Sequence, residues 1–492
     1  MSMVTDNPLH FRRTKIVATL GPTSSDAVTI GQMVAVGVNV FRLNMSHGTH
    51  EEHRLRFDRV RAAAKSAGQE VAIMADLCGP KIRVGLFEGG SIELIDSTTV
   101  KVTTRQVLGK SGLIVSQYTS LTEDVVLGDR LLLDDGNIEL QVQRVAGTEL
   151  ECMVVHGGTL KDKKGMNLPG VRVSAPALTE KDRTDALFAC ELGIDFLALS
   201  FVRSAADVVA LRRLVEATSS NPYIVSKIEK PEALDDIDAI LQSSDAIMIA
   251  RGDLGVELDA ARVPNVQEEL VDAARAAHKP VIVATQMLES MIVHSRPTRA
   301  EVTDVANAVR SGADAVMLSA ETAAGVNPLA AVRMMDLVIR RTEDYLYAHG
   351  AFGSIESYTP TQPVQAPSAT ERTCDADTAI AQATAKMSRD LRTSAIVADA
   401  EAATLLALLT AQRPAAMVIA VSSERRARSL GCLTWGVTPL EVAKGDRTPL
   451  ASRAVGLLGT LDREQLGGFL LVVGSQDGNC PSLSILAGSS SD

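Results

Sequence analysis

The hydrophobic pattern of the first 350 residues alternates between short apolar runs and longer amphipathic segments. The apolar runs have the length of strands, and they are Lys15–Leu20, Val38–Leu43, Glu70–Ala75, Ile194–Leu199, Tyr223–Ser226, Ala246–Ala250, Pro280–Ala284 and Ala313–Leu318. Helical periodicity separates many of them, at residues 50–66, 204–217, 231–242, 264–278 and 298–311. Strands alternating with helices form right-handed parallel units, and eight such units predict a (β/α)8 TIM barrel.

Polar residues follow most of these runs and help to choose between two architectures. They are Arg42, Asn44, Asp76, Ser200, Lys227, Glu229, Asp253, Thr285, Gln286, Ser319 and Glu321. A barrel gathers the carboxyl ends of its strands into one ring, whereas the rival doubly wound open sheet spreads them along an edge. The shared polar endings therefore favour the barrel.

About a hundred residues interrupt this rhythm after the third run. They alternate as strands do at 91–95, 98–103, 137–145 and 149–155, with turn signals at Gly89-Gly90 and Asp135-Gly136-Asn137. We predict a small β-barrel lid domain at residues 80–175, inserted in a catalytic barrel made of residues 1–79 and 176–350. Such a lid would exclude water from bound substrate, and an inert insertion is the alternative.

The last part of the chain forms another unit. A long helical pattern at 327–347 is followed by the linker SIESYTPTQPVQAPSAT and then by alternating helices and strands over 373–486. We predict a C-terminal α/β domain at residues 351–492. It has no cluster of charges at its strand ends, which indicates a regulatory or assembly role.

Composition excludes several classes of function. The chain has 492 residues, 46% of them hydrophobic, and a net charge of −11, which argues against a nucleic-acid partner. Its six cysteines are scattered, as expected for free thiols in a reducing compartment. The N-terminus has no apolar signal core and no run is long enough for a membrane span, so we expect a cytoplasmic protein without a membrane partner.

The strand-end residues suggest a specific chemistry. Glu229 and Asp253 follow adjacent strands, so their carboxylates can share one Mg²⁺ ion. Lys227 can stabilise a developing negative charge, and Arg42 can bind a phosphate through two hydrogen bonds. Backbone N–H groups near Gly252 and the hydroxyl of Thr285 would complete a site for a small, doubly anionic acid. The simpler interpretation is a set of solvated charges at strand ends.

Several motifs resemble those of the pyruvate kinase family. They are KIVATLGPTS at 15–24, VFRLNMSHG at 40–48, DLCGPKIRVG at 76–85, KKGMNLPG at 163–170, ALTEKD at 177–182, SKIE at 226–229, ARGDLGVE at 250–257 and ATQMLESMI at 284–292. The resemblance is close over residues 13–350, and the tail matches in domain type. It implies an allosteric, homotetrameric enzyme of glycolysis that transfers the phosphoryl group of phosphoenolpyruvate to ADP, giving pyruvate and ATP.

The resemblance also implies roles for individual residues. Arg42 would bind the phosphoryl group, Lys227 would stabilise its charge and that of the enolate, and Glu229 and Asp253 would hold Mg²⁺, with Mn²⁺ as an alternative. Gly252, Asp253 and Thr285 would line the substrate carboxylate, and Thr285 and Ser319 would lie where the enolate gains a proton. The residues facing the nucleotide phosphates would be Asn44, Ser46, His47, Arg83 and Lys181.

The chain departs from the family pattern beside the third strand. In potassium-dependent members the motif at this position resembles D-T-K-G-P-E. In this chain the same six positions are Asp76-Leu77-Cys78-Gly79-Pro80-Lys81. The monovalent-cation pocket would comprise Asn44, Ser46, Asp76 and Leu77, with the Lys81 ammonium replacing potassium, so that K⁺ is not required. The alternative is that Lys81 is a surface charge at the lid hinge.

A second departure concerns regulation. Members activated by sugar bisphosphates carry a Ser/Thr- and Gly-rich phosphate loop in the tail, whereas this chain has ADAEAATL at 398–405. Asp399 and Glu401 would repel a phosphate, which argues against fructose 1,6-bisphosphate as the activator.

Two other functions stay open at this point. A Mg²⁺-dependent pyruvate-enolate aldolase or lyase would also use a barrel, two carboxylates and an arginine, but would need neither the lid nor Lys227. A non-catalytic metabolite sensor would predict a damaged ring of charges. An assay of phosphoenolpyruvate with ADP separates the three.

Overall fold

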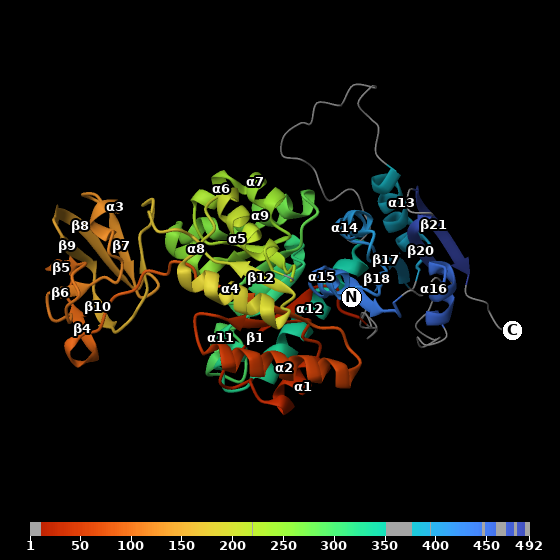
Figure 1. Cartoon of the computed structure of the whole chain (residues 1–492), viewed down its shortest axis with the longest axis horizontal. Helices are drawn as coiled ribbons and strands as arrows, with labels where there is room; N and C mark the ends of the chain where they lie inside the picture. The colour runs from red at the N-terminus through yellow and green to blue at the C-terminus, as the bar shows by residue number, and fades with distance from the viewer. Residues whose placement is uncertain are drawn as a thin grey trace, which may run out of the picture.

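The computed structural model describes residues 11–350 and 376–487, apart from positions 219, 394, 445–447, 459–468 and 477–479. Three bodies follow one another in space (Figure 1). A central barrel lies between a β-rich body, at the left of the view, and a C-terminal α/β body, at the right. The linker predicted at 354–370 lies outside the described residues. Within the described ranges, no helix is long and apolar enough to cross a membrane.

Eight parallel strands close the central barrel in the order β1-β16-β15-β14-β13-β12-β3-β2. They are β1 (Lys15–Leu20), β2 (Val40–Asn44), β3 (Ala72–Asp76), β12 (Phe196–Leu199), β13 (Tyr223–Ile228), β14 (Ala246–Ala250), β15 (Val281–Ala284) and β16 (Ala315–Leu318). The first and last strands meet with Lys15 opposite Ala315. The predicted TIM barrel is therefore confirmed, and each strand begins within two residues of its predicted start.

The helices α1 to α12 belong to the barrel body, except for the short α3. They are α1 (Ala27–Ala35), α2 (His50–Ala67), α4 (Glu180–Leu192), α5 (Ala205–Glu216), α6 (Glu232–Asp235), α7 (Ile237–Ser243), α8 (Arg251–Glu257), α9 (Val263–Ala276), α10 (Arg299–Ser311), α11 (Ala320–Ala323) and α12 (Pro328–Ala348). Local chemistry sets their ends. For example, α10 begins with a capping box between Thr298 and Glu301 and ends at Gly312, whose φ of 95° suits the left-handed cap.

Two apolar layers hold the barrel together. One packs the strands against the surrounding helices, and the other fills the inside of the barrel with residues such as Val17, Met74 and Phe196. The inner layer also contains Cys432 and Leu433 from the C-terminal body. Apolar side chains of that body therefore close the amino end of the barrel, and the carboxyl end remains for chemistry.

The inserted segment forms a six-stranded sheet, in the order β11-β7-β8-β9-β5-β6, and a two-stranded sheet of β10 and β4. The elements are β4 (Ser91–Leu94), β5 (Thr99–Thr103), β6 (Leu113–Val115), α3 (Leu121–Asp124), β7 (Arg130–Leu133), β8 (Ile138–Ala146), β9 (Glu149–His156), β10 (Gly158–Lys161) and β11 (Met166–Asn167). Alternate residues of these strands enclose a separate apolar core that includes Val102, Leu140 and Val154.

The C-terminal body is a five-stranded sheet in the order β19-β18-β17-β20-β21, parallel except for the last strand. Its elements are α13 (Ala376–Asp390), β17 (Ala395–Asp399), α14 (Ala403–Ala411), β18 (Met417–Ser422), α15 (Arg425–Leu433), β19 (Val437–Glu441), α16 (Leu450–Leu458), β20 (Phe469–Gln476) and β21 (Cys480–Ala487). Polar contacts join this body to the amino ends of the barrel strands. Arg413 binds Asp314 at 2.8 Å, and Ser429 donates to Asp195 at 2.7 Å.

Candidate active site

Lys227 lies at the centre of the predicted ring of charges. Because β13 extends to Ile228, Lys227 is the penultimate residue of that strand, and only 9% of it is exposed. Its ammonium donates to Ser200 Oγ at 2.7 Å and lies 2.9 Å from Glu229 Oε1 and 3.3 Å from Asp76 Oδ1. The end of β3, the residue after β12 and the end of β13 therefore fix one cation.

Asp76 joins this cation to Arg42. Arg42 Nε donates to Asp76 Oδ2 at 2.6 Å, and Arg42 Nη1 donates to Thr19 Oγ1 at 3.0 Å. Burial would raise the pKa of Asp76, but the charges of Lys227 and Arg42 bring it below its ordinary value. Asp76 is therefore ionised and orients two cations toward the same end of the barrel.

The charges around Lys227 also set its protonation state. Burial would lower the pKa of Lys227, but Asp76 and Glu229 together raise it above its ordinary value. Its ammonium is therefore charged at neutral pH, and a group that stays charged can stabilise an oxyanion.

Glu229 and Asp253 form the predicted carboxylate pair. Glu229 is buried, with its Oε2 accepting from the Phe201 N–H at 2.8 Å. Burial raises the pKa of Glu229; Lys227 opposes this and Asp253 adds to it. Asp253 is more open, and the Lys81 ammonium lies 3.8 Å from its Oδ1.

This pair fits a divalent cation. Within the described residues, no group of three or more His, Cys, Asp or Glu side chains could hold a metal alone. The Asp253 carboxylate makes ionisation of Glu229 more costly, and a cation between the two groups would offset that cost. Mg²⁺ usually takes one or two carboxylates together with waters and substrate oxygens. The residues present therefore fit such an ion.

Thr285 lies beside this pair in an unusual backbone conformation. Its φ is +73°, in the left-handed region that a β-branched residue rarely adopts. The Gly252 N–H donates to Thr285 Oγ1 at 2.7 Å, and Arg251 Nη2 donates to the Thr285 carbonyl at 2.9 Å. Two contacts from α8 therefore hold a strained residue at the end of β15, as is common in active sites.

The residues predicted to face the nucleotide surround the end of β2. Asn44 Oδ1 accepts from the Ser46 N–H at 3.1 Å, and the Lys181 ammonium donates to the Met45 carbonyl at 2.7 Å. His47 is exposed, and its pKa is lowered by partial burial and by the charges of Arg83, Arg42 and Lys81.

His47 is therefore within electrostatic reach of three cations. One of them, Arg83, comes from the inserted segment and donates to the Lys163 carbonyl at 3.0 Å. The cationic groups proposed for the nucleotide thus come from both sides of the opening.

The remaining predicted residues have partners other than Lys227 and Arg42. Ser319 is half-buried, and its N–H donates to Glu321 Oε2 at 2.7 Å. Leu77 is buried, and its N–H donates to the Ala198 carbonyl at 2.9 Å. The partners of Asp76 are Arg42, Lys227 and Ser200, whereas Lys81 lies beside Asp253.

Sequence reasoning missed two residues that support the site. Thr19, inside β1, accepts a hydrogen bond from Arg42. Its only signal in the sequence was a hydroxyl residue within the otherwise apolar stretch 16–20 of that strand. Arg251 holds Thr285 and also binds Asp304 at 2.5 Å. Its side-chain contacts lie 16 or more positions along the chain from it, so no local pattern could have revealed this role.

A closed barrel with two cations, a carboxylate pair and a strained hydroxyl residue at its carboxyl end defines an enzyme that acts on a small anionic substrate. The family described as "Pyruvate kinase, barrel domain" matches residues 11–332. A pyruvate kinase from Mycobacterium intracellulare is 40% identical over 479 residues, covering 96% of this chain and 98% of that protein. One from Geobacillus stearothermophilus is 44% identical over 434 residues, covering 87% and 71%.

A solved structure agrees with these sequences. The crystal structure of a pyruvate kinase from Cryptosporidium parvum superposes with a TM-score of 0.87 at 34% identity, covering 97% of this chain and 96% of that one. The chain belongs to the pyruvate kinase family, and it is a phosphotransferase of glycolysis. Membership implies use of a divalent metal ion, and it removes the aldolase and sensor alternatives.

Proposed function

We propose that Arg42 and Lys227 bind the phosphoryl group while it moves from phosphoenolpyruvate to ADP. Both cations are buried, and Asp76 orients both. The hydrogen bonds from Arg42 to Thr19 and Asp76 leave one of its guanidinium nitrogens, Nη2, without a described partner for a phosphate oxygen. Lys227 would stabilise the negative charge on the phosphoryl group and on the enolate that remains.

We propose that Glu229 and Asp253 hold Mg²⁺, with Mn²⁺ as an alternative. When bound, the ion supplies positive charge for the substrate oxygens. Before the ion binds, Lys227 and Lys81 partly neutralise the two carboxylates, at 2.9 and 3.8 Å. Each of the two carboxylates therefore has a lysine ammonium beside it before the metal ion binds.

The substrate carboxylate would lie against Gly252, Asp253 and Thr285. A side chain at position 252 would come within 3.2 Å of Thr285 Oγ1, so glycine leaves room there. Thr285 and Ser319 would lie near the carbon of the enolate that gains a proton, through a water molecule.

The nucleotide phosphates would contact Asn44, Ser46, His47, Arg83 and Lys181. These residues combine neutral donors with two cations, which suits a flexible polyphosphate. Because Arg83 belongs to the inserted segment, that segment would close over the nucleotide as a lid. The limits of the three domains, at 79/80, 175/176 and 350/351, are part of this proposal.

We propose that K⁺ is not required, because Lys81 supplies a tethered positive charge. Its ammonium is within reach of Asp253 and close enough to lower the pKa of His47. Lys81 would therefore act from the edge of the site nearest the divalent ion. Leu77 would have no part in holding a cation.

The observation that carries this proposal is the contact of one buried ammonium, that of Lys227, with both Asp76 and Glu229. The test is an assay of phosphoenolpyruvate with ADP at increasing Mg²⁺ concentration. Asp253→Asn should need about tenfold or more Mg²⁺ for half-maximal rate, since one anionic ligand is lost. Asp58→Asn, an exposed change on α2, is the control. Equal Mg²⁺ requirements in all three proteins would contradict the assignment.

We also propose a cytoplasmic homotetramer with interfaces on the barrel and on the C-terminal body. The chain mass is 52.1 kDa, so light scattering should report about four times that value. A monomer at micromolar concentration would refute this assembly.

A further inference from the structure

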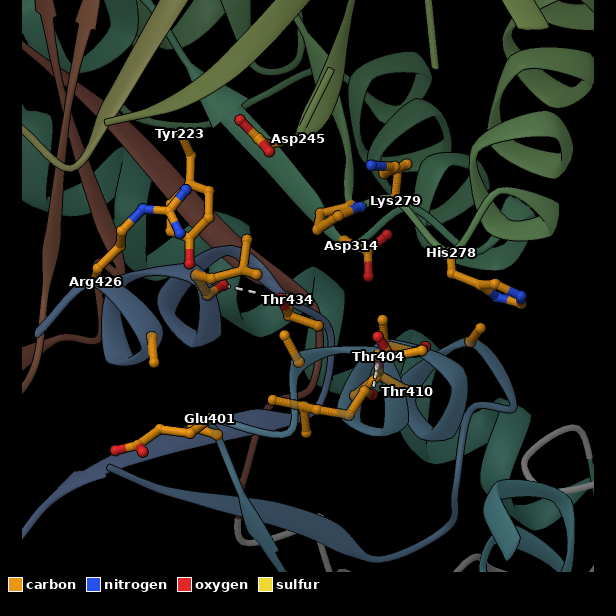
Figure 2. Close-up of a pocket in the computed structure, with 18 of the residues that line it drawn as sticks. Tyr223, Asp245, His278, Lys279, Asp314, Glu401, Thr404, Thr410, Arg426 and Thr434 are labelled. Carbon is orange, nitrogen blue, oxygen red and sulfur yellow. Dashed lines mark hydrogen bonds between the residues drawn. The ribbon is translucent and has the colours of Figure 1, made fainter. Parts of the chain in front are cut away.

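One lysine fastens helix α4 to the turn that follows β2. The Lys181 ammonium donates to the Met45 carbonyl at 2.7 Å and pairs with Asp185, one helical turn further along α4. The Met45 N–H donates to the Asp76 carbonyl at 2.9 Å, which ties this turn to the end of β3. The Lys181 ammonium therefore lies at the carboxyl end of the barrel, whereas the cavity around Asp314 that Figure 2 shows lies at the amino end.

Asp185 is a buried carboxylate with two side-chain partners. Only 4% of its side chain is exposed, whereas 56% of the Lys181 side chain is exposed. One oxygen, Oδ2, accepts from Lys181, and the other, Oδ1, lies 2.8 Å from His50 Nε2. Because a carboxylate beside an ammonium is an acceptor only, His50 Nε2 is the donor in this contact. Both oxygens are therefore engaged, which fixes the plane of the carboxylate and the place at which it holds Lys181.

His50 is held in place by its own neighbours. Its ring stacks on that of Phe188, with the centroids 4.0 Å apart and the two planes 2° from parallel. His50 is the first residue of α2, directly after the Thr49 N-cap and its capping box, and Phe188 lies on α4 three residues after Asp185. Residues three positions apart share one face of a helix, so α4 presents Asp185 and Phe188 together to the start of α2.

The Lys181 ammonium keeps one donor for a ligand. An ammonium has three N–H groups, and within the described part of the chain the contacts with Met45 and Asp185 use two of them. A long exposed side chain has many rotamers, and fixing it on a ligand costs conformational entropy. Because Met45 and Asp185 restrict Lys181 before a ligand binds, much of that cost is met in the free protein.

The charge of Asp185 has two opposite effects on a phosphate near Lys181. It restricts the ammonium to one place, which favours binding, and it adds a negative charge nearby, which opposes binding. The carboxylate is buried and both of its oxygens are engaged by Lys181 and His50, whereas the ammonium is exposed. The restriction of Lys181 therefore outweighs the repulsion.

We propose that Asp185 and His50 are positioning residues for the nucleotide phosphates, and this inference rests on the proposed role of Lys181 in binding ADP. Asp185 holds the Lys181 ammonium at the turn after β2, and His50 holds Asp185. A side chain that is already in place loses less freedom when its ligand binds, so the affinity for ADP is higher. Both residues act through Lys181 and take no part in the transfer of the phosphoryl group.

The experiment measures the KM for ADP, the KM for phosphoenolpyruvate and the turnover of Asp185→Asn in the full chain. Asparagine keeps the size of the side chain and removes the charge that holds Lys181. The KM for ADP should rise by about tenfold, because a hydrogen bond to a charged group is lost. The KM for phosphoenolpyruvate and the turnover at saturating ADP should stay within about twofold, since only the binding of ADP is affected. Calorimetric titration with ADP and Mg²⁺ should show the same loss of affinity.

Glu191→Gln is the matched control. The Glu191 carboxylate pairs with Arg54 at 2.8 Å, so it also joins α4 to α2, but 67% of its side chain is exposed and its ion pair does not involve Lys181. Its KM for ADP should equal that of the unmodified chain. His50→Phe keeps an aromatic ring beside Phe188 and leaves the pair of Lys181 with Asp185 intact. Its KM for ADP should rise by about two- to fivefold, because one hydrogen bond to Asp185 is lost.

A double-mutant cycle tests whether Asp185 acts through Lys181. Lys181→Met should raise the KM for ADP by about tenfold or more, and adding Asp185→Asn to it should change the KM no further. Effects that multiply in the double variant, or a KM for ADP that is lowered in Asp185→Asn, would overturn the proposal. A raised KM in Lys181→Met with an unchanged KM in Asp185→Asn would refute the positioning alone. An unchanged KM in Lys181→Met would instead refute the proposed role of Lys181 in binding ADP.

Discussion

The two ends of the barrel use the same kind of interaction for different purposes. At the carboxyl end, Asp76 of β3 forms buried ion pairs with Arg42 of the neighbouring β2 and with Lys227 of β13, two strands away. At the amino end, the pair between Arg413 and Asp314 joins the barrel to another body of the protein. Removing one partner of a buried ion pair leaves the other charge buried without compensation, so a substitution at either end should be costly. The end of the barrel at which an ion pair lies therefore decides whether loss of one partner affects catalysis or the attachment of the C-terminal body.

The largest expected effect is at the amino end. Asp314→Asn would leave the Arg413 guanidinium without its counter-charge, and only 8% of Arg413 is exposed. The free energy of unfolding should fall by about 3–5 kcal/mol, with turnover of the folded enzyme unchanged. Urea denaturation measures the first and the kinase assay the second.

Asp272→Asn is the matched control, because that carboxylate is more exposed and lies 4.0 Å from Arg275. Its effect on stability should be within about 0.5 kcal/mol. If Asp314→Asn lowered turnover but not stability, the two ends would not differ as described.

The next effect concerns the carboxyl end. Lys227→Met removes the charge that we propose stabilises the phosphoryl group during transfer, so turnover should fall by about 10²–10³. The KM for phosphoenolpyruvate should change much less, because Arg42 and the residues around the substrate carboxylate remain. Steady-state kinetics distinguish the two parameters.

Replacement of Arg212 by Met offers a comparison, since its ion pair with Asp245, at 3.0 Å, lies at the amino end of β14. That variant should keep its turnover. A Lys227→Met enzyme with raised KM and intact turnover would show that Lys227 binds substrate without stabilising the transition state.

The smallest effect is expected from potassium. Rates in potassium chloride and in a tetramethylammonium salt should be nearly equal. The two solutions are matched in ionic strength, because screening by salt alone changes rates. Lys81→Glu should then create a requirement for potassium. A fall by orders of magnitude in the tetramethylammonium salt would show that the unmodified enzyme needs potassium.

Much of this architecture could be predicted from the sequence because parallel strands and their helices have strong local patterns. The boundaries of β1 and β14 match the prediction, and the inserted strands were expected from their alternation. Short or mixed strands such as β6, β11 and β19 were missed, because two to five residues carry too little periodicity.

The candidate site was predicted in part. Lys227 and Glu229 were expected to act together, and the structure places them 2.9 Å apart. The orientation of Lys81 could not be predicted, since its long side chain reaches in several directions from the Gly79-Pro80 turn. Thr285 was expected for its hydroxyl, but its backbone strain depends on Arg251 and on the packing of α8, which no local pattern records.

Closure of the barrel has a consequence for how the chain folds during synthesis. Lys15 pairs with Ala315, so β1 waits for a strand that is made 300 residues later. At about 5–20 residues per second, that wait lasts roughly 15–60 s. During this time one edge of β1 is an unpaired template for other strands, which is a risk for aggregation. The contact of Lys15 with the Val437 carbonyl forms later still. Early protection of β1 therefore depends on β2, its other neighbour, which is complete by residue 44.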